Sequence, residues 1–277
     1  MKKSKYYYTF LLLVINIQLY SQEKQGIVNY GYIKSLLTGQ KQGEEYKAQL
    51  TFDNNHSFFV TQKDSLENNV DKTEEVTIIE PNEANGNVGV INLSGSNSRL
   101  ITNFVGNQVY FDREKDTLWS YVMGMGNMYI KEKKPTINWK FEKETKKVGK
   151  YTCHKATAPF RGRDYTVWYT TEIPIPYGPW KFNGLPGLVL EAYDSEYKIY
   201  FYFKNMEYPV KEPIKISFIQ EDIEEKRTKW FRYDTYLKHA NNLIEQKYER
   251  SLLIAKELPK YIPTKQKMEN LYLETTK

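Results

Sequence analysis

The chain has 277 residues with a formal net charge of +6, and 40% of its residues are hydrophobic. This fraction is too high for a disordered chain, and no apolar run is long enough to span a bilayer, so a soluble globular protein is expected. A single cysteine excludes a disulfide scaffold and any metal site built on several cysteines.

The N-terminus has the pattern of a secretory signal peptide. Three lysines within the first five residues precede an apolar stretch from Tyr6 to Tyr20, and the small Ser21 offers a cleavage site. The apolar stretch of about 15 residues is shorter than the roughly 20 that a membrane anchor needs. We therefore predict that residues 1–21 are a removed signal peptide and that residues 22–277 form a single domain.

Export sets the expected compartment and the surface charge. No cysteine lies near the cleavage region, so the mature protein should be periplasmic or extracellular in a two-membrane bacterium and not a lipoprotein. Loss of the three lysines lowers the net charge from +6 to +3. The remaining charges are of mixed sign without a large basic block, which argues against nucleic acid as a partner.

Short runs of β-branched and aromatic residues, separated by turn-forming clusters, dominate the chain up to residue 220. Strand–helix alternation is missing from this part, which favours an antiparallel sheet over a doubly wound fold. The segment Lys63–Ser98 is polar, and part of it is expected to be an excursion between strands. The predicted strands are Lys47–Phe52, Ser57–Thr61, Val76–Glu80, Val88–Leu93, Gln108–Phe111, Tyr151–Ala156, Tyr165–Tyr169, Leu188–Tyr193 and Ile199–Lys204.

A proline-rich segment, Ile173–Leu190, is the most distinctive stretch. Its prolines at positions 174, 176 and 179 favour extended backbone and remove hydrogen-bond donors, so the segment should cross a surface or a sheet edge. Within it, Leu185–Leu188 has proline second and glycine third, which predicts a type II turn with positive φ at Gly187.

The large apolar side chains on this stiff backbone allow two roles. Tyr177, Trp180 and Phe182 either close the end of a core or form a preorganised surface for a ligand or partner. Burial of all three beyond nine-tenths would rule out the second role. The candidate binding residues are Tyr177, Pro179, Trp180, Phe182, Gly184, Leu185, Pro186, Gly187 and Leu188.

The C-terminal part changes character at Glu221, where acidic residues open an amphipathic stretch. Four apolar residues recur every seven positions: Ile223, Trp230, Leu237 and Ile244. This spacing predicts a helix from about Glu221 to Leu258 that covers one face of the sheet and buries these four residues, Trp230 among them, against it. The alternative is a helix that stands away from the sheet and offers this stripe to a partner.

Together the elements predict a mainly β fold of the α+β class. A curved antiparallel sheet or half-open barrel should carry the long C-terminal amphipathic helix, in an arrangement similar to the lipoprotein-carrier folds of the periplasm.

The proline-rich segment also carries a resemblance to a known family. Gly178–Leu190 has the sequence GPWKFNGLPGLVL, which resembles the signature of the GLPGLI family of secreted bacterial proteins, with Leu188-Val189 where the name gives Leu-Ile. The resemblance covers roughly residues 139–205, and Lys150 stands where the family often has a glycine. Because the family has no established activity, the resemblance implies no catalytic residue, cofactor or ligand. Further similar stretches are Trp139–Phe141, Glu144–Ala156, Gly162–Tyr165 and Trp168–Thr170.

Titratable residues give no complete catalytic set. Cys153 and His154 are adjacent, but neighbours in a strand point to opposite faces and cannot share a proton. The three histidines, in an expected loop, strand and helix, lack the spacing of metal ligands. Five carboxylates are candidates for an acid–base pair or for ion pairs with Arg161 and Arg163: Glu142, Glu144, Asp164, Glu191 and Asp194.

These patterns favour a non-catalytic binding protein without a cofactor. An aromatic-lined concave face of the sheet would hold an apolar small molecule or a segment of an envelope protein. The alternative is a hydrolase of the cell envelope that uses carboxylates around the proline-rich segment. The protein is expected to be monomeric and not to span the membrane once the signal peptide is removed.

Overall fold

A computed structural model of the chain describes residues 24–35, 42–67, 75–79, 89–93, 101–123, 127–219, 229–258, 260 and 262–265. The predicted signal peptide lies outside these residues. So do most of the predicted excursion between residues 63 and 98 and the first residues of the predicted helix, 221–228.

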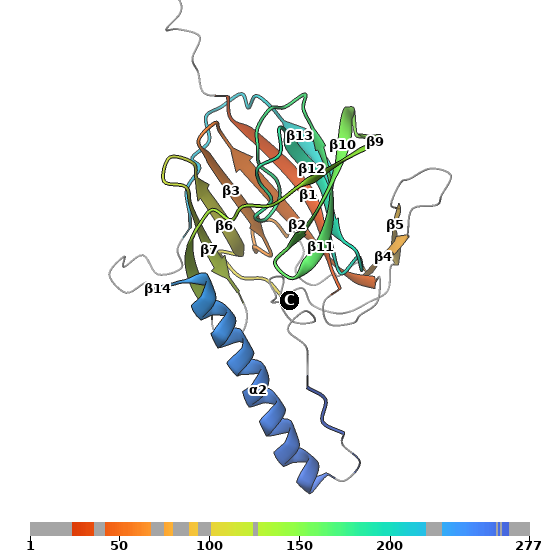
Figure 1. Ribbon diagram of the computed structural model, residues 1–277, viewed down its shortest axis with the longest axis vertical. Helices are drawn as coiled ribbons and strands as arrows, with labels where there is room; N and C mark the ends of the chain where they lie inside the picture. The colour runs from red at the N-terminus through yellow and green to blue at the C-terminus, as the bar shows by residue number, and fades with distance from the viewer. Residues whose placement is uncertain are drawn as a thin grey trace, which may run out of the picture.

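Within the described residues, fourteen strands form one sheet (Figure 1). Its main path runs β14-β8-β7-β6-β3-β2-β1-β13-β12-β11-β10-β9, and β4 pairs with both β2 and β5. All neighbours are antiparallel except β14 and β8. The strands are β1 Gly26–Lys34, β2 Gln42–Phe52, β3 His56–Thr61, β4 Glu75–Ile79, β5 Gly89–Leu93, β6 Asn107–Asp112, β7 Thr117–Val122, β8 Met128–Lys133, β9 Lys140–Val148, β10 Tyr151–Phe160, β11 Arg163–Thr170, β12 Leu188–Asp194, β13 Ile199–Glu207 and β14 Trp230–Phe231.

The predicted strands are confirmed, but five observed strands were not predicted. Each of the nine predicted runs overlaps one observed strand. The strand β9 shows why some were missed: its sequence KFEKETKKV is dominated by charged side chains and lacks an apolar alternation, because most of its residues face solvent. The strand β9 forms because it pairs with β10, and its own sequence pattern does not indicate a strand.

The strand β1 lies at the centre of the sheet and joins its two halves. It pairs with β2 on one side and with β13, far away in sequence, on the other. Val28, Tyr30 and Tyr32 alternate along it and are buried. The ring of Tyr32 stacks on that of Phe201 with centroids 4.6 Å apart.

The sheet is strongly curved, as predicted, and its concave face holds the main core. Phe59 of β3 meets Phe201 of β13 edge to face, with 5.7 Å between ring centroids, although two strands separate theirs in the sheet. The Tyr30 hydroxyl donates a hydrogen bond to the carbonyl oxygen of Val189 in β12 at 2.7 Å. Side chains from both halves of the sheet therefore converge on one apolar cluster.

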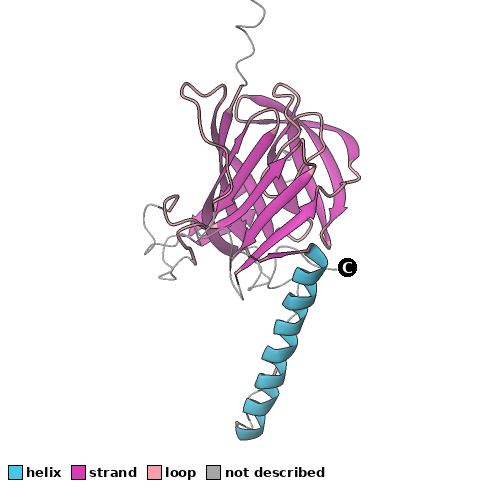
Figure 2. Ribbon diagram, turned by 90° about the vertical axis from the view of Figure 1, so that its left-hand side faces the viewer, coloured by secondary structure: helices cyan, strands magenta, loops and turns pink. Residues whose placement is uncertain are grey.

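The C-terminal helix α2, Tyr233–Glu257, starts later than predicted and points away from the sheet (Figure 2). Trp230 is half-buried in the short strand β14, which pairs with β8, so its predicted place in the helix is wrong. Among the described residues, the helix packs on the sheet near its start, where Tyr236 contacts Met128 and Ile130. The helix therefore does not cover a face of the sheet as expected, and the concave face is filled by other residues, described below.

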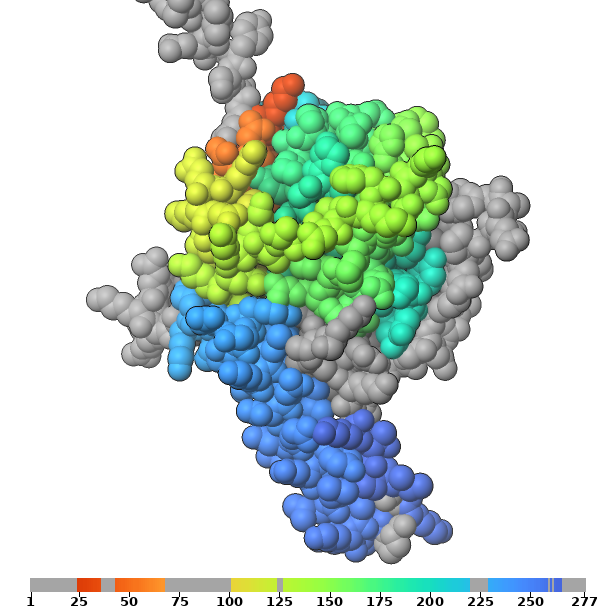
Figure 3. Space-filling view, in the orientation of Figure 1, coloured from red at the N-terminus to blue at the C-terminus, as the bar shows by residue number. Residues whose placement is uncertain are grey.

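The far part of α2 combines a buried side with exposed apolar residues, and residues that follow the helix lie beside it (Figure 3). Ala240 and Ile244 are buried. An ion pair between the Lys265 ammonium group and the Glu245 carboxylate, 2.5 Å apart, places residues 262–265 alongside the helix. Among the described helices, none has the length and apolar character needed to cross a membrane.

Candidate functional site

The proline-rich segment has the extended backbone that its prolines predict. Ile173, Ile175 and Tyr177 are buried, whereas the intervening Pro174 is exposed, so alternate residues point inward. The backbone N–H of Leu188 donates to the carbonyl oxygen of Ile173 at 3.0 Å. The segment is therefore held against the start of β12.

Its aromatic side chains fill the concave side of the sheet. Tyr177 packs edge to face on Phe111 of β6, with ring centroids 5.8 Å apart. Phe182 lies 4.9 Å from Tyr165 of β11 in the same geometry. Since β6 and β11 lie in different halves of the sheet, the segment is packed between the two halves and joins them.

Burial rules out the predicted contact surface. Tyr177, Trp180 and Phe182 are only 2%, 6% and 2% exposed, so these residues close the core and the binding prediction for this segment is wrong. These aromatic side chains of the chain itself occupy this part of the concave face. Of the other predicted site residues, Gly184 and Pro186 are exposed, and Pro179, Leu185, Gly187 and Leu188 are buried.

Two of the three glycines of this segment, Gly184 and Gly187, are constrained in different ways, and the prediction for Gly187 is wrong. Positive φ occurs at Gly184, where φ is 86°, and not at Gly187, so the predicted type II turn is wrong. Gly187 is required by space: a Cβ atom there would lie 2.0 Å from the carbonyl oxygen of Thr170. The close approach of residue 187 to the end of β11 explains why a glycine stands there.

A buried ion cluster links the proline-rich segment to the start of α2. The Lys181 ammonium nitrogen lies 2.6 Å from one carboxylate oxygen of Glu132 in β8, and the Arg161 guanidinium pairs with the other. The Arg161 guanidinium also stacks over the ring of Tyr233, the first residue of α2, at 3.5 Å from its centroid. We call Glu132, Arg161, Lys181 and Tyr233 the Glu132 cluster.

The electrostatics of the Glu132 cluster stabilise its charged form. The Lys181 side chain is fully buried, and those of Glu132 and Arg161 are nearly so. Burial disfavours a charged carboxylate, but the nearby Lys181 and Arg161 charges outweigh it and hold the pKa of Glu132 below its ordinary value. The electron-rich face of Tyr233 further favours the Arg161 cation.

Sequence reasoning missed the Glu132 cluster, although one pattern hinted at it. Lys181 stands between Trp180 and Phe182 in an otherwise apolar stretch. A lysine at such a position is buried only when it is paired. The identity of its partner was not visible, because Glu132 lies 49 positions away.

A second buried ion pair involves a predicted carboxylate. Glu191 of β12 lies 2.8 Å from the ammonium nitrogen of Lys146 and accepts a hydrogen bond from the Tyr200 hydroxyl at 3.3 Å. Burial raises the pKa of Glu191 despite the Lys146 charge. The Lys146 ammonium also lies 4.5 Å from the centroid of the Trp168 ring. This arrangement is a structural ion pair packed against an aromatic ring.

The other predicted carboxylates have separate partners. Asp194 pairs with Arg163 at 3.0 Å, and both side chains are buried. Glu142 pairs with Lys140, Glu144 pairs with Lys155, and Asp164 is exposed. Glu142, Glu144 and Asp194 therefore each pair with a different basic side chain. Arg161, expected to pair with one of these five, contacts Glu132 instead.

Cys153 and His154 lie as the strand geometry predicts. Cys153 is fully buried, and burial raises the pKa of its thiol to about 12. His154 is only half-buried, and its ring packs against that of Tyr169 at 5.8 Å between centroids. With the two side chains on opposite faces, they do not form a nucleophile–base pair.

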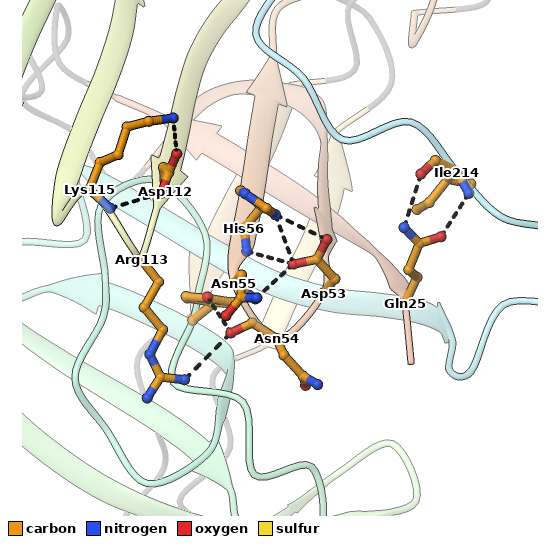
Figure 4. A network of polar contacts seen from close by, with 10 residues as sticks. Gln25, Asp53, Asn54, Asn55, His56, Asp112, Arg113, Lys115 and Ile214 are labelled. Atoms are coloured by element: carbon orange, nitrogen blue, oxygen red, sulfur yellow. Dashed lines mark hydrogen bonds and ion pairs between the residues drawn. The ribbon is translucent and has the colours of Figure 1, made fainter. Parts of the chain in front are cut away.

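His56 belongs to a polar network around the β2–β3 turn (Figure 4). It is the first residue of β3 and not in a loop as expected. One carboxylate oxygen of Asp53 accepts hydrogen bonds from the backbone N–H groups of Asn55 and His56 at 2.8 and 2.6 Å. The carbonyl oxygen of Asn54 accepts a bond from the Tyr177 hydroxyl at 3.2 Å. The network thus fixes a turn and contacts Tyr177 of the proline-rich segment.

Metal ligation has no visible basis in the described part of the chain. Among those residues, no group of three or more histidine, cysteine, aspartate or glutamate side chains is placed to hold a metal ion.

Comparisons with known proteins match this region without naming an activity. The model of a family described as "Protein of unknown function (Porph_ging)" matches residues 161–191, which include Arg161, Lys181 and Glu191. Two solved structures of PNGF-II, in different space groups, are similar with a TM-score of 0.46 and identities of 11% and 13%. The alignments cover 77% and 76% of this chain, which spans only 32% of the PNGF-II chain. No curated protein matches.

Proposed function

We propose that the chain is an exported member of the GLPGLI family that acts in the periplasm or outside the cell as a non-catalytic binding protein. Its contact surface is the far part of α2, not the proline-rich segment. The N-terminal pattern of lysines, apolar residues and Ser21 supports export. The match of residues 161–191 to a family of unknown function supports the family assignment.

The observation that carries this proposal is the exposed apolar end of α2. Leu252, Leu253, Ile254 and Leu258 are 40%, 60%, 47% and 56% exposed. Ile262, just beyond the helix, is 83% exposed. We call these five residues the arm tip. Grouped apolar side chains in water are typical of a surface that another molecule covers.

The Glu132 cluster anchors the start of α2, so that the rest of the helix can hold the arm tip in a fixed position. Arg161 over Tyr233 and the packing of Tyr236 on β8 fix the first turn of the helix to the sheet. Backbone hydrogen bonds then keep the remaining turns in line with the first. The helix is therefore a support that positions the arm tip at a distance from the sheet, as Figure 2 shows.

Export is testable by mass spectrometry of the protein purified from its own cells. We expect a chain that starts directly after residue 21, because Ser21 ends the apolar stretch. A cytoplasmic protein that retains Met1 would contradict the proposal.

The role of the arm tip is testable by photo-crosslinking in living cells. A photoreactive amino acid at position 253 should form an adduct with a component of the envelope, because this side chain is 60% exposed at the end of the arm. The same amino acid at position 143, an exposed lysine of β9, should form none and serves as the control. Equal amounts of crosslinked adduct from positions 253 and 143 would contradict a special role of the arm tip.

A further inference from the structure

The exposed end of α2 combines apolar and basic side chains, and together they indicate its partner. We propose that the arm tip binds the surface of a lipid bilayer that carries anionic headgroups. This inference rests on the proposed role of α2 as the contact surface and names what it contacts. The apolar side chains would enter the boundary between headgroups and acyl chains, and the basic ones would meet the phosphates.

The distribution of apolar side chains favours a fluid environment over a protein groove. A helix that lies in a groove offers one stripe, with apolar residues three or four positions apart. Leu252, Leu253 and Ile254 are instead consecutive, so they point to different sides of the helix. Ile262 adds a further exposed apolar group beyond the helix end. A bilayer can surround such an end, whereas a groove covers only one side.

Charge complementarity supports an anionic surface. Between residues 250 and 262 the basic residues are Arg250, Lys256 and Lys260 and the acidic one is Glu257, so three positive charges minus one negative give +2. All four side chains are exposed. Long basic side chains can keep their charges at the headgroups while neighbouring apolar groups insert. Each basic group near an anionic membrane contributes about 1 kcal/mol to binding.

The position of the arm tip allows contact with a flat surface. The far part of α2 lies at the opposite end of the molecule from the upper edge of the sheet, with no described strand beside it (Figures 1 and 2). A planar bilayer can therefore reach it without meeting the sheet. The contact is peripheral, because a stretch of this length is shorter than the roughly 20 apolar residues that span a bilayer.

The test is co-sedimentation of the purified protein with lipid vesicles. We expect binding to vesicles of equal parts phosphatidylcholine and phosphatidylglycerol, and much weaker binding to phosphatidylcholine alone. The variant Leu253→Gln should bind about tenfold more weakly, because it removes one inserted leucine. Lys256→Gln combined with Lys260→Gln should weaken binding to the anionic vesicles only.

A matched control tests whether the arm tip has a specific effect on vesicle binding or whether any exposed apolar side chain has the same effect. Ile101 is 61% exposed and lies outside α2, so Ile101→Gln removes a similar exposed side chain and should leave vesicle binding unchanged. Circular dichroism should show the same helix content and melting temperature for all variants, because each changed side chain is exposed.

Two results would overturn the lipid proposal. The first is the absence of binding to either vesicle; the second is binding that Leu253→Gln leaves unchanged. The protein could fail to bind vesicles while the photoreactive residue at position 253 still crosslinks to an envelope protein or to a second copy of the chain. In that case the proposal of a lipid partner is wrong, but the proposed role of α2 as the contact surface stands. If both vesicle binding and crosslinking fail, the proposed function falls as well.

Discussion

Replacement of Gly187 by alanine is expected to destabilise the protein by about 3 kcal/mol, at the upper end of the range for overpacking. The added Cβ would lie 2.0 Å from the carbonyl oxygen and 2.7 Å from the carbonyl carbon of Thr170. Both atoms belong to backbone, so no side chain can rotate to make room. The loss should appear as a lower midpoint in urea denaturation.

Gly184 provides the control within the same segment. It has a positive φ of 86°, but a Cβ atom there would meet nothing within 4 Å. Gly184→Ala should therefore show only the conformational cost of the left-handed region, about 1–2 kcal/mol. If Gly184→Ala destabilises the protein more than Gly187→Ala, backbone conformation and not space is the decisive constraint in this segment.

The second large effect is expected for Glu132→Gln. This change removes the charge that Lys181 and Arg161 contact in a buried site, and loss of one partner from a buried ion pair costs about 3–5 kcal/mol. The folded protein should survive with a clearly lower urea midpoint at neutral pH. The expected control is Glu144→Gln, which breaks a solvent-exposed pair with Lys155 and should change the midpoint little.

Glu132 also predicts how stability depends on pH. The pKa of this carboxyl is lower in the folded than in the unfolded protein, so its contribution is fully present above the unfolded value. The contribution disappears as the pH falls through the folded value. Urea midpoints measured from neutral to acidic pH should therefore fall less steeply for Glu132→Gln than for the parent. Parallel curves would show that Glu132 titrates alike in both states.

Local patterns were sufficient to predict much of the fold. The runs rich in β-branched and aromatic residues are strands, and Cys153 and His154 lie on opposite faces as a strand requires. The prolines at 174 and 176 do produce an extended backbone with alternating burial. A requirement for glycine at 187 was also recognised, but for the wrong reason, because the clash with Thr170 depends on how two separate segments approach each other.

The predictions that failed depend on contacts between distant residues. Whether Trp180 is exposed or buried is decided by Phe160 and Tyr165, which the local sequence of the proline-rich segment does not specify. Trp230 fits the seven-residue spacing of the predicted helix. It nevertheless lies in a strand, because its backbone pairs with Tyr129 of β8. The same limit hid Glu132 as the partner of Lys181.

The pairing of β1 with β13 has a consequence for how the chain folds. Ile27 lies opposite Glu207, so the centre of the sheet closes only when residues almost a whole domain apart in sequence meet. Such long loops carry a large entropic cost before their contacts form, which slows folding. The first strand must therefore wait, unpaired on that side, until the thirteenth has been synthesised. A chain with this topology stays incompletely folded during most of its synthesis, which suits the proposed export through a narrow translocation channel.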